Sequence, residues 1–464
     1  MEDITILGGG IGGLSVAYYA KKNQLTTKII EASGKIGGNC ITNQHNGFYF
    51  DSGAHRFHDK DRTITKEVLS LLKDQIKLIN VPSKIYHNGK LIDFPLSPLN
   101  LMANLGLFTF TKAASQILAF RLANKSSTAN FKKFSQYKYG NILADAFLLN
   151  YSEKLWGVPA SKLSINASGK RMKGLDLKTF IREAFLGTKS KTEHLDGVFY
   201  YPKRGIGNII DHMGCFIGKE DIFLNNEITQ VNHHNNKITH LELNSNETIE
   251  VNKVVNSIPL NAFLRMMKPS LPKKVLEAGS ALKCRDMILV AIFLNNESIT
   301  KAATIYFPDK QFIFTRLYEP KNRHKLMAPQ GKTSLVVEIP CQRTDSLWQQ
   351  SDDQITKKVK NQLKKIFGIR ETEIIDSAVR RMYYAYPILE ITAEKRANFV
   401  LKYLDRFTNL AITGRPGKFQ YTHIHDIFRQ AAEILDLFKS STSILNRFNG
   451  SSVIQSANEH YCKR

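Results

Sequence analysis

The spacing of apolar and polar residues along the chain predicts both strands and helices. Ile4–Leu7 is a short, mostly apolar run of the kind that forms a buried parallel strand, and Leu14–Ala20 has the composition of a helix. Between Asp221 and Pro259, apolar residues alternate with polar ones, which is typical of antiparallel strands. Further strands are predicted at Met287–Phe293, Thr304–Phe307, Phe312–Leu317 and Ser334–Ile339.

Helical patterns occupy other parts of the chain. Ile355–Phe367 has apolar residues at helical spacing with lysines opposite, and residues 61–150 look mostly helical. Within them, Lys125–Tyr139 is polar, basic and aromatic, and we expect a mobile loop over a cleft. Leu99–Phe120 is apolar but interrupted by polar residues, so it lacks the run of about twenty apolar residues that a membrane span needs. We expect it to pack in the core, while lining a pocket or contacting a membrane surface stays open.

A glycine-rich turn joins the first strand to the first helix. The sequence from Gly8 to Gly13 reads G-x-G-x-x-G in strand–turn–helix order, the pattern that binds dinucleotides. The first glycine allows the tight turn, the second lets backbone approach a pyrophosphate, and the third lets the helix pack closely on the strand. A second strand, Thr27–Ile30, ends at an acidic residue placed to accept a hydrogen bond from a ribose hydroxyl. The predicted nucleotide contacts are therefore Gly8, Gly10, Gly12, Gly13 and Glu31.

More glycines follow, and with them the sequence resembles a known family. The Gly-Gly at 37–38 and the Asp-x-Gly at 51–53, added to the features above, resemble the FAD-binding region of the glutathione-reductase-type flavoproteins. Within these, the chain is similar to the group that holds amine oxidases, protoporphyrinogen oxidase, phytoene desaturases and UDP-galactopyranose mutase. Amine oxidases usually have Arg after the Gly-Gly, whereas Asn39 and the segment Gly53–His58 resemble the mutases and bacterial protoporphyrinogen-oxidase-like proteins.

This resemblance implies FAD as the cofactor and a set of site residues. In that branch the segment Gly53–His58 would pass beside the isoalloxazine ring, which makes His55 and His58 candidates for contact with the flavin and for catalysis. A second shared stretch, Tyr151–Pro159, and the Lys-Arg that follows belong in the family to a substrate-facing region. There Trp156 would line the site and Arg171 would reach into it, and a guanidinium can bind a carboxylate or diphosphate bidentately. Further implied cofactor contacts are Gly37, Gly38, Asn39, Gly53, Ala54 and Ile228, the last against the adenine.

The C-terminal part resembles the family segment that meets the N1/O2 edge of the flavin. It supplies Gly414, Arg415 and Tyr421 as implied cofactor contacts. The mutases have a tyrosine where this chain has Phe419, and relatives commonly have a basic residue at the place of Gln420; both departures weigh against a nucleotide-sugar substrate. Other polar and aromatic residues are possible substrate contacts, although aromatics in a sheet are more often core: Arg316, Tyr318, Arg380, Tyr383, Tyr384 and Tyr386.

We therefore expect an α/β fold in which a Rossmann-type, glutathione-reductase-like FAD-binding domain carries an inserted helical and β-sheet substrate domain. The FAD-binding domain is expected to be discontinuous, from residues 1–60, 200–260 and 400–440. Residues 61–199 would form a largely helical substrate or cap region, residues 261–399 a sheet-rich substrate domain, and residues 441–464 a C-terminal tail.

Composition adds information about partners and compartment. Of the 464 residues, 65 are Lys or Arg and 41 are Asp or Glu, and the net charge of +24 favours anionic partners. The basic residues are spread along the chain without a nucleic-acid motif, so no specific nucleic-acid binding is expected, and a genomic bias toward Lys and Asn could equally explain them. The five cysteines are scattered without C-x-x-C spacing, which indicates neither disulfides nor a metal site. With no signal-peptide pattern at Met1, we expect a cytoplasmic protein.

Three functions remain open at this point. The first is an FAD-dependent oxidoreductase, like protoporphyrinogen oxidase or the amine oxidases, which takes a hydride from a small, anionic organic substrate. No second G-x-G-x-x-G follows, so a pyridine-nucleotide reductase is not indicated and oxygen or another acceptor would reoxidise the flavin. The alternative is a non-redox mutase resembling UDP-galactopyranose mutase, which His55, His58, Trp156 and Arg171 favour. The third is a flavin-bound protein with a structural or sensing role.

Overall fold

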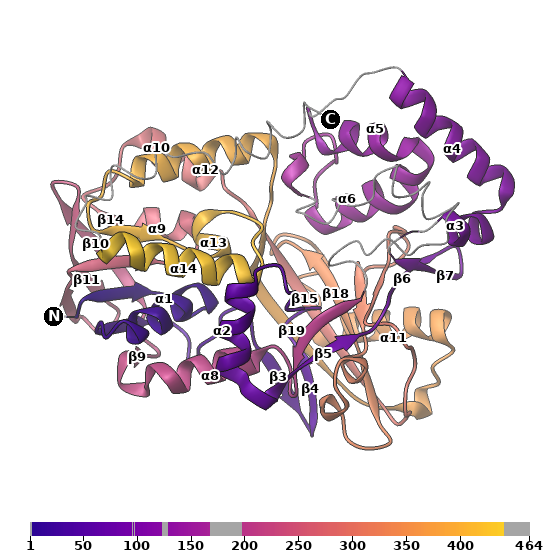
Figure 1. Ribbon diagram of the computed structural model, residues 1–464, viewed down its shortest axis with the longest axis horizontal. Coiled ribbons are helices and arrows are strands. Elements are labelled where there is room, and N and C mark those ends of the chain that lie inside the picture. Colours follow the sequence, from indigo (N-terminus) through magenta and orange to yellow (C-terminus); the bar gives the residue numbers. More distant parts are fainter. Residues whose placement is uncertain (1, 95, 97, 123–128, 168–196, 440–464) are drawn as a thin grey trace. The chain divides into compact units, whose positions relative to one another are not determined.

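The computed structural model describes residues 2–94, 96, 98–122, 129–167 and 197–439 (Figure 1). The chain forms two compact units. Unit 1 combines Met1–Gly38, Met213–Leu282 and Lys395–Arg464, and unit 2 combines Asn39–His212 and Lys283–Glu394. Unit 1 is thus assembled from three segments that are far apart in the sequence.

A five-stranded parallel sheet forms the centre of unit 1. Its strands β1 and β2 are the predicted ones, and Ile4, Ile6 and Leu7 are completely buried, as expected of a central parallel strand. Because all neighbours are parallel, the carboxyl ends of the strands meet at one edge of the sheet. In spatial order the strands are β20 (Leu410–Ile412), β13 (Lys253–Asn256), β1 (Ile4–Leu7), β2 (Thr27–Ile30) and β9 (Ile222–Phe223).

Helices pack on this sheet. The predicted first helix is confirmed as α1 (Ile11–Lys22), and it lies beside α14 (Ile424–Lys439) (Figure 1). The rings of Tyr18 and Tyr19 contact Phe428 of α14. The sequence before α14 also forms α12 (Ile391–Leu404) and the short α13 (Arg415–Lys418).

A second sheet of unit 1 has four strands. Three of them pair antiparallel, as the alternation after Asp221 predicts, whereas β13 of the same stretch joins the parallel sheet instead. The strands are β12 (Thr248–Glu250), β11 (Lys237–Leu243), β10 (Ile228–His234) and β14 (Met267–Lys268), and the helices α9 (Leu260–Met266) and α10 (Lys273–Ser280) flank β14 in sequence.

Unit 2 is organised around a seven-stranded sheet. The predicted strands at Met287–Phe293 and Ser334–Ile339 lie in its two longest buried strands, β15 and β18, which pair antiparallel. In order, the strands are β19 (Ile374–Pro387), β15 (Cys284–Leu294), β18 (Thr333–Cys341), β17 (Arg316–Tyr318), β16 (Thr304–Tyr306), β6 (Ser83–His87) and β7 (Lys90–Phe94).

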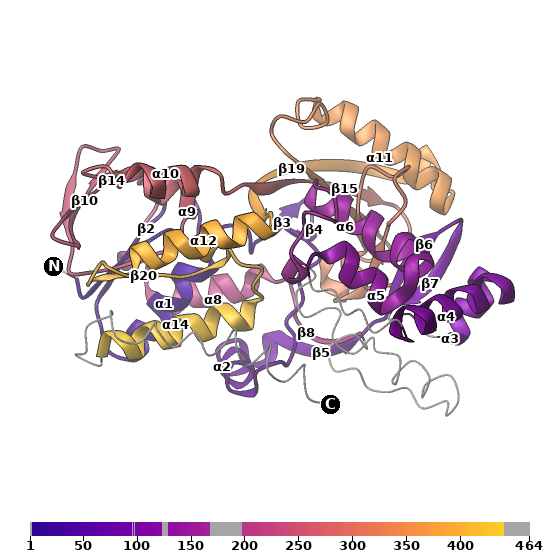
Figure 2. The ribbon, with the colours of Figure 1, turned by 90° about the horizontal axis from the view of Figure 1, so that it is seen from above.

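One face of this sheet is covered by α11 (Asp352–Phe367), the helix predicted at Ile355–Phe367 (Figure 2). Ser351 and Gln354 form a capping box at its start, and Gly368 ends it in the left-handed conformation. The buried residues of α11 pack against alternate residues of β15 and β18. Shorter elements of the unit are β3 (Thr42–His45), β4 (Phe48–Asp51), β5 (Ile76–Asn80), β8 (Val198–Pro202), α2 (Arg62–Leu72) and α8 (Gly207–Ile217), which continues into unit 1.

Residues 61–150 are mostly helical, as predicted, but the loop predicted within them is not found in the part that the structure describes. They contain three strands as well as helices, and β6 and β7 form a hairpin because Asn88 and Gly89 both have positive φ, at 48° and 79°, as a two-residue turn requires. The predicted loop at Lys125–Tyr139 is wrong where the chain is described: residues 131–139 belong to α5 (Phe131–Leu143), whose first turn is capped by Asn130.

The apolar stretch at 99–120 lies in two helices, α3 (Pro98–Leu105) and α4 (Leu107–Leu122), separated by Gly106 with φ 81°. After α5 come a π-helical turn, Ala144–Leu149, and α6 (Asn150–Trp156). No helix in the described part of the chain is both long enough and apolar enough to cross a bilayer.

The strand predicted at Phe312–Leu317 is also wrong for its first half, because β17 covers only Arg316–Tyr318. Phe312 and Phe314 instead pack edge-on against Phe307, with ring centroids 5.1 and 4.8 Å away. Their apolar character therefore reflects burial in a loop rather than a strand.

Candidate functional site

The turn after β1 is built from backbone that tolerates no side chain. Gly8 has φ 95°, and a Cβ on Gly13 would lie 2.1 Å from the carbonyl oxygen of Gly8, so only glycine lets α1 start this close to the strand. A Cβ on Gly12 would lie 3.1 Å from Cα of Gly414. Gly10 differs, because the nearest atom to its added Cβ is Cα of Gly38 at 4.0 Å. Gly10 therefore borders open space.

The N-terminus of α1 faces this open space without a side-chain cap. Gly10 is the N-cap residue, no described side chain caps it, and the first turn holds no acidic residue. The first N–H groups of a helix have no partner inside the helix, and the helix dipole adds partial positive charge there. Ser257 steadies the turn from below, since its Oγ donates to the carbonyls of Leu7 and Gly8 at 2.9 and 3.0 Å. This end of α1 can bind an anion.

Glu31 and the second Gly-Gly stand beside the same turn. One carboxylate oxygen of Glu31 accepts a hydrogen bond from the Gly9 amide at 2.7 Å, and the Gly37 amide donates to the Gly9 carbonyl at 2.8 Å. The chain before Ile228 also reaches this place, because the Asn226 amide donates to the Glu31 carbonyl at 3.0 Å. The structure thus brings the predicted contacts Glu31, Gly37 and Gly38 to the turn after β1, and the segment that leads into Ile228 to Glu31.

The C-terminal segment contributes Gly414, which follows β20 with φ 77° and packs on Gly12. The guanidinium of Arg415 donates to the Thr422 carbonyl at 2.8 Å and lies 5.1 Å from the ring centroid of Tyr421. Arg415 and Tyr421 therefore hold this loop in shape. Phe419 is buried, in the left-handed region at φ 51°.

These features fit a dinucleotide cofactor such as FAD. The wall made of glycine backbone leaves room where a Cβ would stand, beside the uncapped end of α1. The turn from Gly8 to Gly13 would hold the pyrophosphate, Glu31 the ribose, and the segment at Gly414 the far end of the molecule.

In unit 2, Asn39 anchors the residues that follow the Gly-Gly. Its side-chain amide donates to the Tyr383 carbonyl at 2.8 Å, next to Tyr384, which has φ 54° where the pairing of β15 and β19 is irregular. Its backbone carbonyl accepts from Ser52 Oγ at 2.8 Å. Asn39 therefore joins the Asp-x-Gly segment to the edge of the seven-stranded sheet.

The segment Gly53–His55 lies on a buried ion pair. The Ala54 amide donates to Glu338 at 2.6 Å, and Nε of Arg316 donates to the other oxygen of this carboxylate at 2.7 Å. The two side chains are 1% and 6% exposed, so this is a paired charge in the interior. The ring of His55 approaches Ser52 Oγ at 3.4 Å, while His58 packs against Phe199 with 5.9 Å between the ring centroids.

Trp156 connects to the same ion pair. Its buried ring meets Tyr386 edge-on at 5.9 Å between centroids, and the Tyr386 hydroxyl accepts from Nη2 of Arg316 at 2.6 Å. A continuous series of contacts therefore runs from Ala54 through Glu338, Arg316 and Tyr386 to Trp156. Arg171, the fourth catalytic candidate, lies outside the described residues.

Lys154 holds the helix that carries Trp156. Its ammonium donates to the carbonyls of Phe307, Asp309 and Phe314 at 2.8, 2.8 and 2.9 Å, which fixes α6 on the loop around β16 and β17. Burial lowers the pKa of Lys154 to about 7, and the charge of Asp309 opposes that shift.

Sequence reasoning missed Glu338, Asp51 and Arg323 as part of this site. Asp51, the first residue of the Asp-x-Gly segment, and Arg323 are completely buried side by side, with 3.7 Å between Oδ2 and Nη1. Glu338 left a signal in the sequence, since it is the one charged residue in the apolar strand Ser334–Ile339. A charge inside a buried strand needs a partner, and this predicts a buried ion pair.

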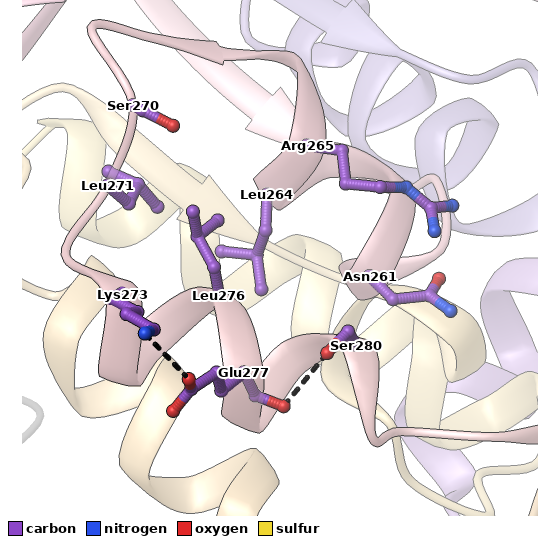
Figure 3. Close-up of a pocket in the computed structure, with 9 residues that line it drawn as sticks. All are labelled: Asn261, Leu264, Arg265, Ser270, Leu271, Lys273, Leu276, Glu277 and Ser280. Carbon is purple, nitrogen blue, oxygen red and sulfur yellow. Dashed lines mark hydrogen bonds and ion pairs between the residues drawn. The ribbon is translucent and has the colours of Figure 1, made fainter.

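A separate surface pocket of about 570 Å3 lies on α9 and α10 in unit 1 (Figure 3). Leu264, Leu271 and Leu276 form its apolar part, and Lys273 and Glu277 form an ion pair at its rim with 4.0 Å between the charged atoms. None of the predicted site residues lines this pocket.

By sequence, residues 11–390 match the family described as flavin containing amine oxidoreductase. Protoporphyrinogen oxidase 1, chloroplastic, of Spinacia oleracea is 29% identical over 185 residues, 38% of this chain and 33% of that protein. Coproporphyrinogen III oxidase of Bacillus subtilis (strain 168) is 21% identical over 430 residues, 85% of this chain and 89% of that protein. The chain thus matches about a third of the length of the spinach relative and most of the bacterial one.

By structure, the chain is similar to a reduced UDP-galactopyranose mutase. The TM-score is 0.79 at 17% sequence identity, over 96% of this chain and 98% of that one. At this identity the likeness concerns the fold alone, and it confirms the predicted α/β fold class.

Proposed function

Because the chain belongs to the flavin containing amine oxidoreductase family, we propose that it is an FAD-dependent oxidoreductase acting on an anionic organic substrate. The observation that carries this is the glycine-walled, uncapped N-terminus of α1, with Glu31 and Gly414 beside it. Bound there, FAD would accept a hydride from the substrate. We further propose that unit 1 is the FAD-binding domain.

The residues of unit 2 would bind and orient the substrate. Arg316 is buried and paired with Glu338, and it supports the Tyr386 hydroxyl, against whose ring Trp156 packs. Arg171 remains the candidate for a cationic contact. Such a contact suits a carboxylate group, which arginine binds bidentately. Porphyrinogens carry carboxylate side chains, and the named relatives make this substrate class our first choice.

The structure offers no obvious general base on the described face of this cluster, because Glu338 is occupied by Arg316 and by the Ala54 amide. The task of the described residues is then positioning. Holding a C–H bond against an acceptor in one orientation contributes much of the rate in such reactions. His55 and His58 stay candidates for moving a proton.

A nucleotide-sugar mutase is the second candidate. Arg171, the candidate cationic contact, would also suit a diphosphate, and this favours the mutase. Against it, Phe419 stands where the mutases have a substrate tyrosine, and its side chain is 3% exposed. We therefore rank it below the oxidoreductase.

An anaerobic titration separates the two candidates. The oxidised and the photoreduced protein are titrated separately with UDP and UDP-sugars, and the flavin spectrum is followed. An oxidoreductase should show no specific response and should reoxidise when oxygen is admitted. Tight binding by the reduced form, with a sugar isomer appearing and no net flavin oxidation, would contradict the proposal.

We also propose that α3 and α4 contact an anionic membrane surface. Phe108 and Leu107, at the start of α4, are 82% and 64% exposed, and Leu118 and Met102 add further exposed apolar surface on these helices. Apolar side chains on a helix of a strongly basic protein suit binding to an anionic interface. Phe108→Asp should reduce sedimentation with vesicles of phosphatidylglycerol, whereas Phe399→Asp, also at an exposed aromatic, should not. Equal sedimentation of both variants and the wild type would contradict this contact.

The proposed compartment is the cytoplasm. Among the described cysteines, Cys215, Cys284 and Cys341 are free thiols, as a reducing compartment would keep them. Fractionation of cells that express the chain tests this placement.

A further inference from the structure

Four charged side chains are buried around one short segment, Ser52–Arg56. Asp51, Arg316, Arg323 and Glu338 are each less than a tenth exposed. Burying charges is costly even when they are paired, so a fold that gathers two such pairs at one place has a use for the geometry they impose. Ala54, His55 and Arg56, which these charges contact or adjoin, are themselves partly exposed. Buried charged side chains that hold a partly exposed segment in place indicate that the backbone conformation of this segment is important for function.

Asp51 is the centre of one pair. Its carboxylate accepts hydrogen bonds from the Tyr201 hydroxyl at 2.5 Å, from Thr42 Oγ1 at 2.7 Å and from the Ile206 amide at 2.9 Å. Burial raises the pKa of Asp51, while Arg323 opposes that shift. Three donors and one cation fix this carboxylate in a single position.

Arg323 links the carboxylate of Asp51 to the partly exposed segment Ser52–Arg56. Its Nη1 lies 3.7 Å from Asp51 Oδ2 and donates to the His55 carbonyl at 3.1 Å. The guanidinium also lies over the ring of Tyr318, 4.4 Å from the centroid, and the Tyr318 hydroxyl donates to the Asp51 carbonyl at 2.6 Å. Arg323 is therefore held from several sides while it holds His55.

Two glycines of the stretch Tyr201–Gly207 make room for this arrangement. A Cβ on Gly205 would lie 2.5 Å from Asp51 Oδ1, and one on Gly207 would lie 2.5 Å from the Thr42 amide. Gly205 also has φ 94°. The stretch that follows β8 thus serves as a socket for Asp51.

We propose that Asp51 and Arg323 are positioning residues that fix the backbone of His55, and that they thereby set the affinity of the protein for FAD. This rests on the proposed function and on the prediction from the sequence that His55 contacts the flavin. Asp51 and Arg323 act through the His55 carbonyl rather than by touching the cofactor. A residue that contacts a cofactor directly keeps its geometry only when the residues behind it hold it in place.

The test compares FAD affinity with stability in matched variants. Asp51→Asn and Arg323→Met remove one charge each, and Arg323→Lys keeps the charge. The control is Val337→Ala. Val337 is buried on the face of β18 that packs against α11, opposite the face on which its neighbour Val336 packs with Phe48 and Phe50. The control therefore removes buried apolar contacts without touching the buried charges. Thermal unfolding gives the stability, and quenching of flavin fluorescence gives the dissociation constant.

We expect the dissociation constant for FAD to rise about tenfold in Asp51→Asn and Arg323→Met, and less in Arg323→Lys. Val337→Ala should lower the melting temperature by a similar amount, yet its dissociation constant for FAD should stay within about twofold of the wild-type value. If a single variant does not fold, the double variant Asp51→Asn/Arg323→Met leaves no lone buried charge and is measured instead.

Variants of the pair that bind FAD as the wild type does, or no more weakly than Val337→Ala, would overturn the positioning role alone. A wild-type protein that binds no FAD would overturn the proposed function, and the positioning role with it. The two failures are thus distinguishable.

Discussion

Two glycines of the turn after β1 should respond in opposite ways to the same substitution. Gly13→Ala places a methyl group 2.1 Å from the carbonyl oxygen of Gly8 and 2.9 Å from Cγ2 of Ile6, and neither can move without shifting β1. Gly10→Ala places one where the nearest atom is 4.0 Å away, at a φ of −72° that alanine adopts readily. Gly13→Ala should therefore disturb the packing of α1 on β1, whereas Gly10→Ala should only fill part of the open space beside the turn.

The structure sets the expected sizes. Overpacking a rigid site costs about 1–3 kcal/mol, and contact with backbone puts Gly13→Ala at the upper end, about 3 kcal/mol. Gly10→Ala should stay within about 1 kcal/mol of the wild type in the protein without cofactor, because its methyl group meets nothing there. The same methyl group would stand in the path of a pyrophosphate, and about 1–3 kcal/mol of overpacking is about a 5- to 150-fold loss of FAD affinity.

Urea unfolding of the protein without cofactor and fluorescence titration with FAD measure the two quantities. Gly10→Ala should separate them, with near-normal stability and weak binding, and Gly10→Val should abolish binding. FAD affinity equal to the wild type in Gly10→Ala and Gly10→Val would refute the placement of the cofactor at this turn. Normal stability of Gly13→Ala would refute the packing described for α1.

Three further predictions concern unit 2. Arg316→Met should cost about 3–5 kcal/mol because it leaves Glu338 buried and unpaired, whereas Arg316→Met/Glu338→Met should cost less; a double variant as unstable as the single one in urea would contradict this. The lowered pKa of Lys154 means that, between about pH 7 and 10.5, the unfolded chain binds more protons than the folded one, so its contribution to stability rises with pH by up to about 1.4 kcal/mol per unit. Lys154→Met should remove that rise, and an identical pH profile of unfolding in the variant would contradict it. Gly205→Ala should destabilise strongly, with its Cβ 2.3 Å from Thr42 Oγ1, whereas Gly89→Ala, with nothing within 4 Å, should cost only the about 1–2 kcal/mol of its positive φ. A similar loss of hydrogen-exchange protection at the Ile206 amide in Gly205→Ala and Gly89→Ala would contradict the role of Gly205 in making room for Asp51.

The parts of the fold that local sequence determines were predictable. The strand Ile4–Leu7, the glycine turn and Thr27–Ile30 are set by short-range pattern, and the structure has them at the predicted residues. The capping box of α11 likewise lies in four consecutive residues. Such features need no knowledge of distant contacts.

The hairpin at Asn88 and Gly89 was missed although its signal was present. Asn-Gly between two runs of alternating character favours a two-residue hairpin. This short pair of strands lies within a segment that is mostly helical, as predicted.

The support of the candidate site could not be read from the sequence. Arg323 reaches His55 across 268 residues, and Glu338 reaches Ala54 across 284. No spacing rule connects residues so far apart, and only the pairing of β15, β17 and β18 brings them together. A lone charge in an apolar strand indicates that a partner exists, but not which one.

A single-turnover experiment without oxygen tests the central claim most directly. The protein, loaded with FAD, is mixed with a porphyrinogen or with an amine, and the yellow absorbance of the oxidised flavin is followed while the product is identified. An FAD-dependent oxidoreductase should lose that absorbance in step with the formation of one equivalent of oxidised substrate, and should regain it when oxygen is admitted. A substrate that is converted to an isomer while the flavin keeps its oxidation state would contradict the claim.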